Sequence, residues 1–432
     1  MTHEDRGLQE VRFPYELLRR WPDAEADNLF AFDATDRLLI DLAAPTIRST
    51  TPDSVVVIGD RYGALTLAAV SLGATGVRVH QDSFAGQLAL AANEETLHGS
   101  AKHASAGFAD SSLDEAMEGG PKVNEALAAL PAMEALLGRR EFVNCPLGEE
   151  LLVGARVVLI QLPKDLAQFE HWIRLVAAYA AEDVRVYAGG RIKHMSKAMN
   201  QVLERCFSDV SASLARQKSR VLSASALRLP RPHVPEAFAE DYDGDLDLWV
   251  CSAPGAFASG RVDHGSRYLV DFFDQLSHRD DSESLVAVDL GCGTGVLASA
   301  LVRSQPPGSK TQYHVIATDR SAAAVTSARA TLSKNVPDGD WEVRQDNALS
   351  QQEDGSLDLI VCNPPFHSDA AVSTELSELL FADAARALKP GGIMLTVFNS
   401  HLPHRKSLER LVGPTEQLGR NPKFTVTRSI KR

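Results

Sequence analysis

The sequence has few cysteines, no long apolar run and no tract of low complexity. Five cysteines dispersed along 432 residues exclude a disulfide framework or a zinc knuckle and favour a reducing cytoplasm. The best candidate for a membrane span, residues 151–162, is too short and is interrupted by Arg156. The first residues lack the basic-then-apolar pattern of a signal peptide. We therefore expect a cytoplasmic protein without a membrane partner.

The composition fits a globular protein of two domains. A hydrophobic content of 44% excludes a disordered or fibrous chain, and 432 residues suit two domains that each bury a core. A proline-rich stretch, residues 230–235, precedes six acids without a base in residues 236–247. We predict domains at residues 1–232 and 248–432, joined by a stiff acidic linker at 233–247.

A short apolar run, residues 359–362, predicts a buried strand that ends in the sequence Asn-Pro-Pro-Phe-His. Because proline has no N–H, the carbonyls of Asn363 and Pro364 are left to accept hydrogen bonds from a group in a cleft. A planar nitrogen with two N–H donors is the natural guest, and Phe366 offers a face to a flat ring. The five residues therefore suggest a site that methylates an amine.

A second motif lies about seventy residues upstream, where the β-branched run 284–288 gives way to alternating glycines. The pattern predicts a strand, a tight turn and a helix, with Gly291, Gly293 and Gly295 letting the backbone approach a ligand. The third glycine comes one residue too early for a dinucleotide site. Asp289 would repel a pyrophosphate but would hold a cationic ligand or accept a hydrogen bond from an ammonium group.

Two further predicted strands end in acids. Asp319 follows the run 314–318 and is suited to a ribose diol, while Asp346 follows 341–345 and would accept from an adenine amino group. Taken alone, Asp319 is equally well explained as a loop acid or a helix N-cap. In this order, however, the motifs resemble the class I S-adenosylmethionine methyltransferases, and the Asn-Pro-Pro-Phe run narrows the resemblance to those that methylate exocyclic or amide nitrogens.

The first half of the chain follows the second in order but lacks its motif residues. Val57 stands where the glycine-rich stretch of the second half has its acid, and Arg61 where it has its middle glycine. Gln161 and Leu162 replace the amide and the first proline. This order argues for a duplicated domain that has lost its ligand site and has a structural or RNA-holding role. A surplus at roughly 98–140 is predicted to be a surface insertion.

Over nearly the whole chain, these features resemble the tandem-domain bacterial ribosomal RNA guanine-N2 methyltransferases of the large- and small-subunit types. Residues 32–39, 214–220 and 421–426 favour the large-subunit type. The resemblance implies an α/β fold of two tandem Rossmann-like class I methyltransferase domains, of which the N-terminal one is degenerate. It also implies methylation of the N2 amine of a guanine in ribosomal RNA, with 23S favoured over 16S, and S-adenosylmethionine as the cofactor.

The resemblance assigns roles to the motif residues. Asn363 and Pro364 would accept the two amine hydrogens while Phe366 stacks on the base, so these three are the predicted catalytic residues. Pro365 and His367 would contact the substrate, with His367 in a positioning role rather than as a base. The predicted cofactor-binding residues are Phe257, Asp289, Gly291, Gly293, Gly295, Asp319, Asp346, Asn347 and Asn363. We expect no metal, because Cys292 and Cys362 have apolar neighbours and are best explained as small buried hydrophobes.

A net charge of −13 has the wrong sign for tight binding of nucleic acid. Basic residues nevertheless outnumber acids ten to two in residues 185–232 and eight to two in 400–432. Either segment is explained by a solvated face or by contact with phosphate, and we predict RNA contacts for Lys193 and Lys197. The expected partner is ribosomal RNA or a ribosomal subunit, bound by a monomer.

Two other functions stay open. The same chemistry would serve a protein glutamine or an adenine amine, although the duplicated domain and the basic segments disfavour a protein substrate. From a different class, the chain would be a non-catalytic RNA-binding factor of ribosome assembly. The intact motifs of the second half argue against that alternative.

Overall fold

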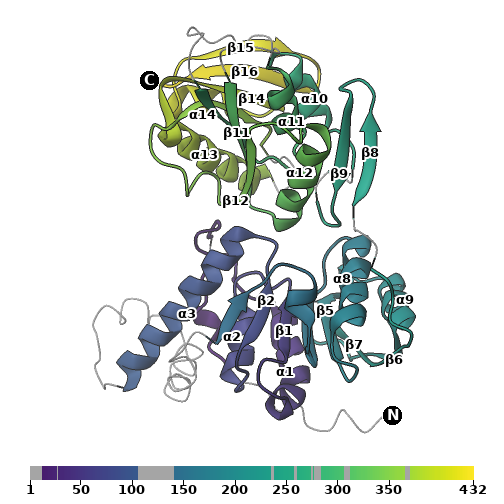
Figure 1. Ribbon diagram of the computed structural model, residues 1–432. Coiled ribbons are helices and arrows are strands. Elements are labelled where there is room, and N and C mark those ends of the chain that lie inside the picture. Colours follow the sequence, from purple (N-terminus) through teal and green to yellow (C-terminus); the bar gives the residue numbers. More distant parts are fainter. Residues whose placement is uncertain are drawn as a thin grey trace. The chain divides into compact units, whose positions relative to one another are not determined.

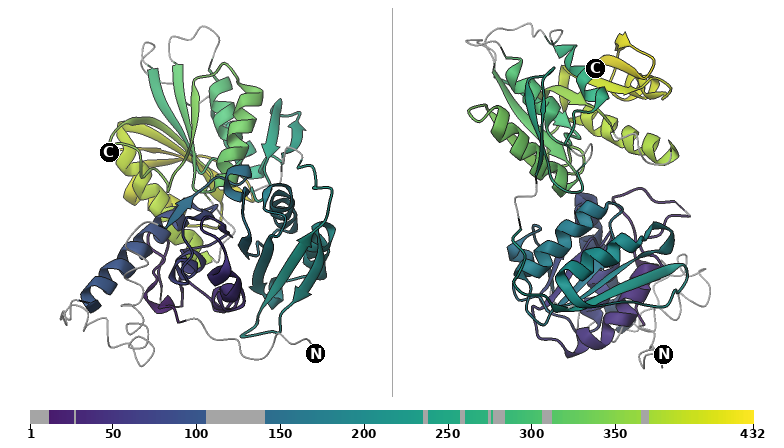
Figure 2. Two further views of the ribbon diagram at one scale, coloured as in Figure 1. Left: turned by 60° about the horizontal axis from the view of Figure 1, so that its bottom comes forward. Right: turned by 90° about the vertical axis from the view of Figure 1, so that its right-hand side faces the viewer.

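The computed structural model describes residues 12–26, 28–105, 141–234, 238–256, 260–273, 276, 284–305, 312–364 and 370–432. The chain separates into two compact units, Met1–Pro235 and Glu236–Arg432 (Figure 1). Each unit has a seven-stranded sheet with helices on both faces (Figures 1 and 2). The α/β fold of two tandem Rossmann-like domains is confirmed.

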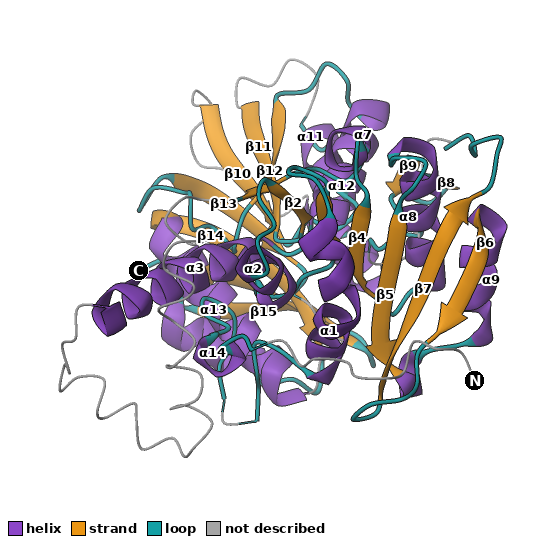
Figure 3. Ribbon diagram, turned by 90° about the horizontal axis from the view of Figure 1, so that it is seen from below, coloured by secondary structure: helices purple, strands orange, loops and turns teal. Residues whose placement is uncertain are grey.

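The first unit has the strand order β3-β2-β1-β4-β5-β7-β6, in which β7 runs opposite to the other six strands. Figure 3 shows β4, β5, β7 and β6 side by side. The elements are η2 (Tyr15–Leu17), α1 (Ala34–Ser49), β1 (Val55–Ile58), α2 (Ala64–Ser71), β2 (Val77–His80), α3 (Phe84–Ser105), β3 (Phe142–Asn144), α7 (Glu149–Leu152), β4 (Val157–Gln161), α8 (Leu166–Tyr179), β5 (Arg185–Arg191), η3 (Ile192–His194), α9 (Lys197–Cys206), β6 (Phe207–Ala212) and β7 (Ser219–Leu227).

The second unit repeats this topology with the order β12-β11-β10-β13-β14-β16-β15, in which only β16 is antiparallel to its sheet neighbours. A separate hairpin, β8 with β9, precedes the sheet. The elements are β8 (Ala239–Asp243), β9 (Leu248–Ser252), α10 (His264–Val270), β10 (Ser284–Leu290), α11 (Val296–Arg303), β11 (Gln312–Asp319), α12 (Ala322–Asn335), β12 (Trp341–Gln345), β13 (Leu357–Cys362), α13 (Ala370–Ala387), β14 (Leu388–Asn399), α14 (His404–Leu411), β15 (Thr415–Arg420) and β16 (Phe424–Ile430).

The central strands are apolar on both faces because helices cover each side of the sheet. Along β10, Ala287 packs with α10, α11 and α12, whereas its neighbours Val288 and Leu290 pack with α13 and α14. This alternation follows from the two-residue period of a strand. β10 lies between β11 and β13, so the strand order reverses there. In open α/β sheets, ligands bind at such a point, in the crevice outside the carboxyl ends of the strands.

The predicted linker at 233–247 was too long, because β8 falls inside it. The acids of this hairpin are neutralised by cations that lie far away in the sequence. Lys334 pairs with Glu240, and Arg267 pairs with Asp243 and Asp245. A run of acids that indicates a solvated connector is therefore compatible with a folded hairpin once tertiary contacts supply the counter-charges.

Helix α10 begins at His264 because the side chain of Asp263 caps it. One other predicted segment lies partly outside the described residues. Of the predicted insertion at 98–140, residues 98–105 belong to α3, and 106–140 lie outside the described residues. In the parts of the chain that the structure describes, no helix has the length and apolar character needed to cross a membrane.

Candidate active site

The glycine turn between β10 and α11 presents open backbone. Gly291 and Gly293 have φ of 75° and 52°, in the left-handed region that favours glycine. A Cβ at either position would meet no heavy atom within 4 Å, so this side of the turn is free for a ligand. Gly295 differs, because a Cβ there would come within 2.8 Å of Ala328 Cα. The third glycine therefore contributes by letting α11 pack closely on α12.

Asp289 has a buried carboxylate, and only one of its two oxygens accepts a hydrogen bond from the described residues. Its Oδ2 accepts a hydrogen bond from the backbone N of Ala298 at 2.9 Å, in the first turn of α11. Its Oδ1 is buried and has no hydrogen-bond partner in the described part of the chain. Burial raises the pKa of this carboxyl to about 7, and the charge of Asp319 adds to the shift. An unpaired buried acceptor with a raised pKa is typical of a ligand site.

Asp319 joins the glycine turn to the next helix. Its Oδ2 accepts from the N of Gly293 at 2.9 Å, and its Oδ1 accepts from the N of Ser321 at 2.9 Å. The N-cap of α12 is Ser321 itself, whose hydroxyl accepts from Ala324. Asp319 is half-buried, and a carboxylate has lone pairs for further hydrogen bonds. The prediction that it binds a ribose diol therefore stays compatible with its position.

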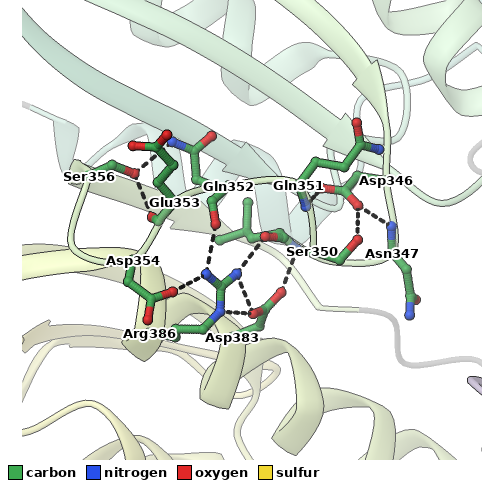
Figure 4. A network of polar contacts seen from close by, with 11 residues as sticks. Asp346, Asn347, Ser350, Gln351, Gln352, Glu353, Asp354, Ser356, Asp383 and Arg386 are labelled. Carbon is green, nitrogen blue, oxygen red and sulfur yellow. Dashed lines mark hydrogen bonds and ion pairs between the residues drawn. The ribbon is translucent and has the colours of Figure 1, made fainter.

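Asp346 organises the turn that follows β12 (Figure 4). Its carboxylate accepts from the N of Asn347 at 2.7 Å, the hydroxyl of Ser350 at 2.5 Å and the N of Gln351 at 3.1 Å. The turn holds Ala348 at a φ of 58°, which is strained for a residue with a Cβ. The half-buried side chain of Asn347 points away from these contacts (Figure 4). Asp346 thus shapes the loop, and its predicted contact with adenine stays a prediction.

Arg386 on α13 anchors this loop, and no sequence motif pointed to this residue. Its guanidinium donates to the carbonyls of Leu349 and Gln352 at 2.6 and 2.7 Å and pairs with Asp354 and Asp383 (Figure 4). Asp383 in turn accepts from the N of Leu349 at 2.7 Å. Four partners from one side chain hold the segment after β12 in a single arrangement.

Asn363 stands at the end of β13 with its amide orientation fixed. Its Nδ2 donates to Asp263 Oδ2 at 2.8 Å and to Ser266 Oγ at 3.0 Å. A carboxylate accepts hydrogen bonds but does not donate them, so the nitrogen must face Asp263. The Oδ1 of Asn363 is consequently directed elsewhere, and it is buried without a hydrogen-bond partner among the residues that the structure describes. The contact between Asn363 and Asp263 joins residues a hundred positions apart and was not predicted from the sequence.

The remaining predicted site residues are only partly placed. Pro364 is buried directly after β13. Lys193 on η3 and Lys197 on α9 are exposed in the first unit. Within the described residues, no group of three His, Cys, Asp or Glu side chains is suited to hold a metal ion. The predicted residues that lie outside the described part of the chain are Phe257, Pro365, Phe366 and His367.

Comparison with known proteins identifies the family. Residues 247–428 match the Methyltransferase small domain, and residues 10–137 and 134–228 match the RLMG N-terminal domain. The chain is 31% identical to the ribosomal RNA large subunit methyltransferase G of Ectopseudomonas mendocina (strain ymp), over 96% of this chain and 97% of that one. The protein of the same name from Streptomyces avermitilis is also 31% identical, with the same two coverages of 96% and 97%. The chain belongs to the ribosomal RNA large subunit methyltransferase G family.

A solved structure shares the fold of this family member over both units. It is the 16S rRNA N2 methyltransferase RsmC of T. thermophilus, solved in complex with AdoMet and guanosine. The TM-score is 0.65 at 18% identity, over 90% of this chain and 92% of that one. The predicted resemblance to the tandem-domain enzymes, with the large-subunit type favoured, is confirmed.

In the RLMG N-terminal domain, the turn after β1 resembles the glycine turn of the second unit, but the space beside it is filled. The N of Gly59 donates to His80 O at 2.9 Å, just as the N of Gly291 donates to Thr318 O at 2.9 Å. A Cβ at Gly59, however, would lie 3.0 Å from Gln161 O and 3.4 Å from the ring of Trp172. The space that is open above Gly291 is therefore filled in the first unit.

In the first unit, the acidic residue of this turn stands at a different sequence position. Val57 is buried at the position of Asp289. The start of α2 is capped instead by Asp60, which accepts from the N of Thr66 at 2.8 Å. These contacts explain how the first unit keeps its fold without an acid at the end of β1, and they support the interpretation that its ligand site is lost.

Proposed function

We propose that the second unit transfers a methyl group from S-adenosylmethionine to the N2 amine of a guanine in 23S ribosomal RNA. The observation that carries the proposal is the buried Oδ1 of Asn363, which has no partner among the described residues and lies where the strand order reverses. Family membership gives the proposal its substrate class, because the relatives are named for methylation of large-subunit ribosomal RNA.

The residues of the crevice fit S-adenosylmethionine. The open backbone at Gly291 and Gly293 leaves room for an extended ligand. The Oδ1 of Asp289 would accept a hydrogen bond from the ammonium group of the methionine portion. The positive charge of that group would stabilise the ionised carboxylate and so counteract burial, which raises the pKa of Asp289. Asp319 and the loop around Asn347 would hold the ribose and the adenine. S-adenosylmethionine, when bound, supplies a methyl group on a positively charged sulfur.

The chain contributes alignment rather than covalent chemistry. Asn363 Oδ1 and the carbonyl of Pro364 would accept the two hydrogens of the guanine amine, which aims its lone pair at the methyl group. The same two acceptors stabilise the positive charge that develops on the nitrogen. Phe366 would stack on the base once it has been taken out of its helix. Losing one such preorganised contact costs about 100- to 1,000-fold in turnover.

Contacts with RNA are proposed for the exposed basic residues of the first unit. Lys193 and Lys197 lie on η3 and at the start of α9. The N of Ile192 donates to Lys218 O at 2.9 Å, so the exposed Lys218 is part of the same basic surface. Replacing these lysines should raise the KM for RNA and reduce its dependence on salt without changing kcat.

The test is transfer of labelled methyl groups to unmodified 23S and 16S RNA, offered both naked and in subunits, followed by digestion to nucleosides. We expect N2-methylguanosine from 23S RNA. Asn363→Ala should lose at least about 100-fold in kcat and keep its affinity for S-adenosylmethionine. The matched control is Gln161→Ala, which removes the corresponding amide of the first unit and should stay active. Wild-type turnover in Asn363→Ala would refute its role, and label in N6-methyladenosine or protein glutamine would refute the proposed substrate.

A further inference from the structure

The orientation of the Asn363 side-chain amide depends on its hydrogen-bond partners. The two ends of a carboxamide have nearly the same shape, so only hydrogen-bond partners decide which end faces a substrate. If the amide were reversed, Nδ2 would face the amine and set donor against donor. The chemistry proposed above therefore depends on whatever holds the nitrogen.

Asp263 holds the Nδ2 of Asn363 in a fixed position. Its Oδ2 lies 2.8 Å from Asn363 Nδ2, and the same oxygen accepts from the backbone N of Gly265 at 2.8 Å and of Ser266 at 3.1 Å. The carboxylate is thus fixed at the start of α10. Gly265 allows this close approach, because a Cβ there would lie 2.9 Å from Asp263 Oδ2 and 3.2 Å from Asn363 Oδ1.

We propose that Asp263 is a positioning residue which, together with Ser266, locks the amide of Asn363 with its oxygen toward the substrate amine. The proposal rests on the proposed function for its catalytic consequence. The orientation itself follows from the chemistry of a carboxylate beside an amide. Asp263 touches neither substrate nor cofactor in this scheme and acts through Asn363.

A purely structural role for Asp263 is the competing explanation, and the first unit shows why it must be tested. There Gln161 Nε2 donates to Asp36 Oδ1 at 2.6 Å, at the start of the corresponding helix α1. The first unit therefore also has a contact between an acid in the first turn of a helix and a side-chain amide, although the space for a ligand is filled in that unit. Asp36 is for that reason the matched control.

The variant Asp263→Ser separates the two explanations. Serine caps a helix about as well as aspartate, but its side chain is too short to reach Asn363 while it caps α10. We expect kcat to fall roughly 10- to 100-fold, with the KM for RNA and the Kd for S-adenosylmethionine within about 3-fold of the wild type. Asp36→Ser should leave all three unchanged. In an Asn363→Ala background, Asp263→Ser should cause no further loss.

A second readout does not depend on activity. In protein labelled with ¹⁵N-asparagine, the side-chain amide resonances of Asn363 are identified by their absence in Asn363→Ala. We expect these resonances to shift in Asp263→Ser and not in Asp36→Ser. Unchanged resonances in Asp263→Ser, wild-type kcat, or a loss that multiplies with Asn363→Ala would each overturn the proposal. If the wild type transfers no methyl group to RNA, the proposed function fails, while the resonances still decide whether Asp263 orients the amide.

Discussion

Replacing Asp289 by asparagine should separate the stability of the second unit from its ability to bind the cofactor. Folding buries this carboxyl and raises its pKa from 3.8 to about 7. A shift of about three units corresponds to about 4 kcal/mol of differential stability between the protonated and charged forms. The folded state binds the proton more tightly than the unfolded chain, so the stabilising contribution is complete below about pH 4 and is lost as the pH rises to about 7.

Asparagine does not titrate, so the variant lacks this pH dependence. Its Nδ2 would replace the unpaired Oδ1 at a constant cost of about 1–3 kcal/mol, because a buried donor is left without a partner. The free energy of unfolding of Asp289→Asn, relative to the wild type, should therefore rise by about 3 kcal/mol between pH 5 and pH 8. Over the same range, its affinity for S-adenosylmethionine should be at least about 10-fold weaker, since the charge that would hold the ammonium group is gone.

The assay is urea-induced unfolding of the full chain at four pH values, with calorimetric titration of S-adenosylmethionine at each. Asp36 is the matched control, because burial also raises its pKa to about 7, in the unit whose ligand space is filled. Asp36→Asn should show the same pH dependence of stability and no loss of cofactor affinity. A stability difference that stays flat from pH 5 to pH 8, or an Asp289→Asn variant that binds S-adenosylmethionine normally, would refute the reasoning.

Two further substitutions test the supports of the site. Arg386→Met should destabilise the second unit by about 2 kcal/mol and weaken cofactor binding, because it leaves two backbone carbonyls of the loop after β12 without their donor. Arg410→Met, which removes a more exposed ion pair, should change the unfolding free energy by less than about 0.5 kcal/mol. Thr331→Val should cost about 1–3 kcal/mol in urea unfolding, because the buried N of Cys251 loses its acceptor. Thr326→Val, whose hydroxyl bonds only within its own helix, should cost far less, and equal losses in both threonine variants would refute the argument.

The strands and the residues at their ends could be predicted because both depend on local pattern. Runs such as 284–288 and 359–362 are apolar on both faces, as a sheet between two helix layers requires. Asp289 and Asn363 were both predicted at the ends of strands, and the pairing of β10 with β13 brings them to the same edge of the sheet.

What could not be predicted are contacts that only the tertiary fold creates. Asp346 had the position of a ligand-binding acid, yet its oxygens accept three hydrogen bonds from its own turn. The partner that orients Asn363 is Asp263, a hundred residues earlier in the chain. No periodicity links such positions, because their proximity depends on how α10 packs across the sheet rather than on local conformation.

The two units differ at positions where the second unit has buried polar atoms that lack a hydrogen-bond partner among the described residues. Within the described residues, the second unit has two buried oxygens without a hydrogen-bond partner, Oδ1 of Asp289 and Oδ1 of Asn363, and both reduce the stability of the folded chain. At the first of these positions the first unit has a buried valine, Val57, and it fills the space beside its turn with Trp172. Each difference favours stability in the first unit and ligand binding in the second. Restoring the acid at Val57 would therefore destabilise the first unit without creating a binding site, because the indole of Trp172 would still occupy the space.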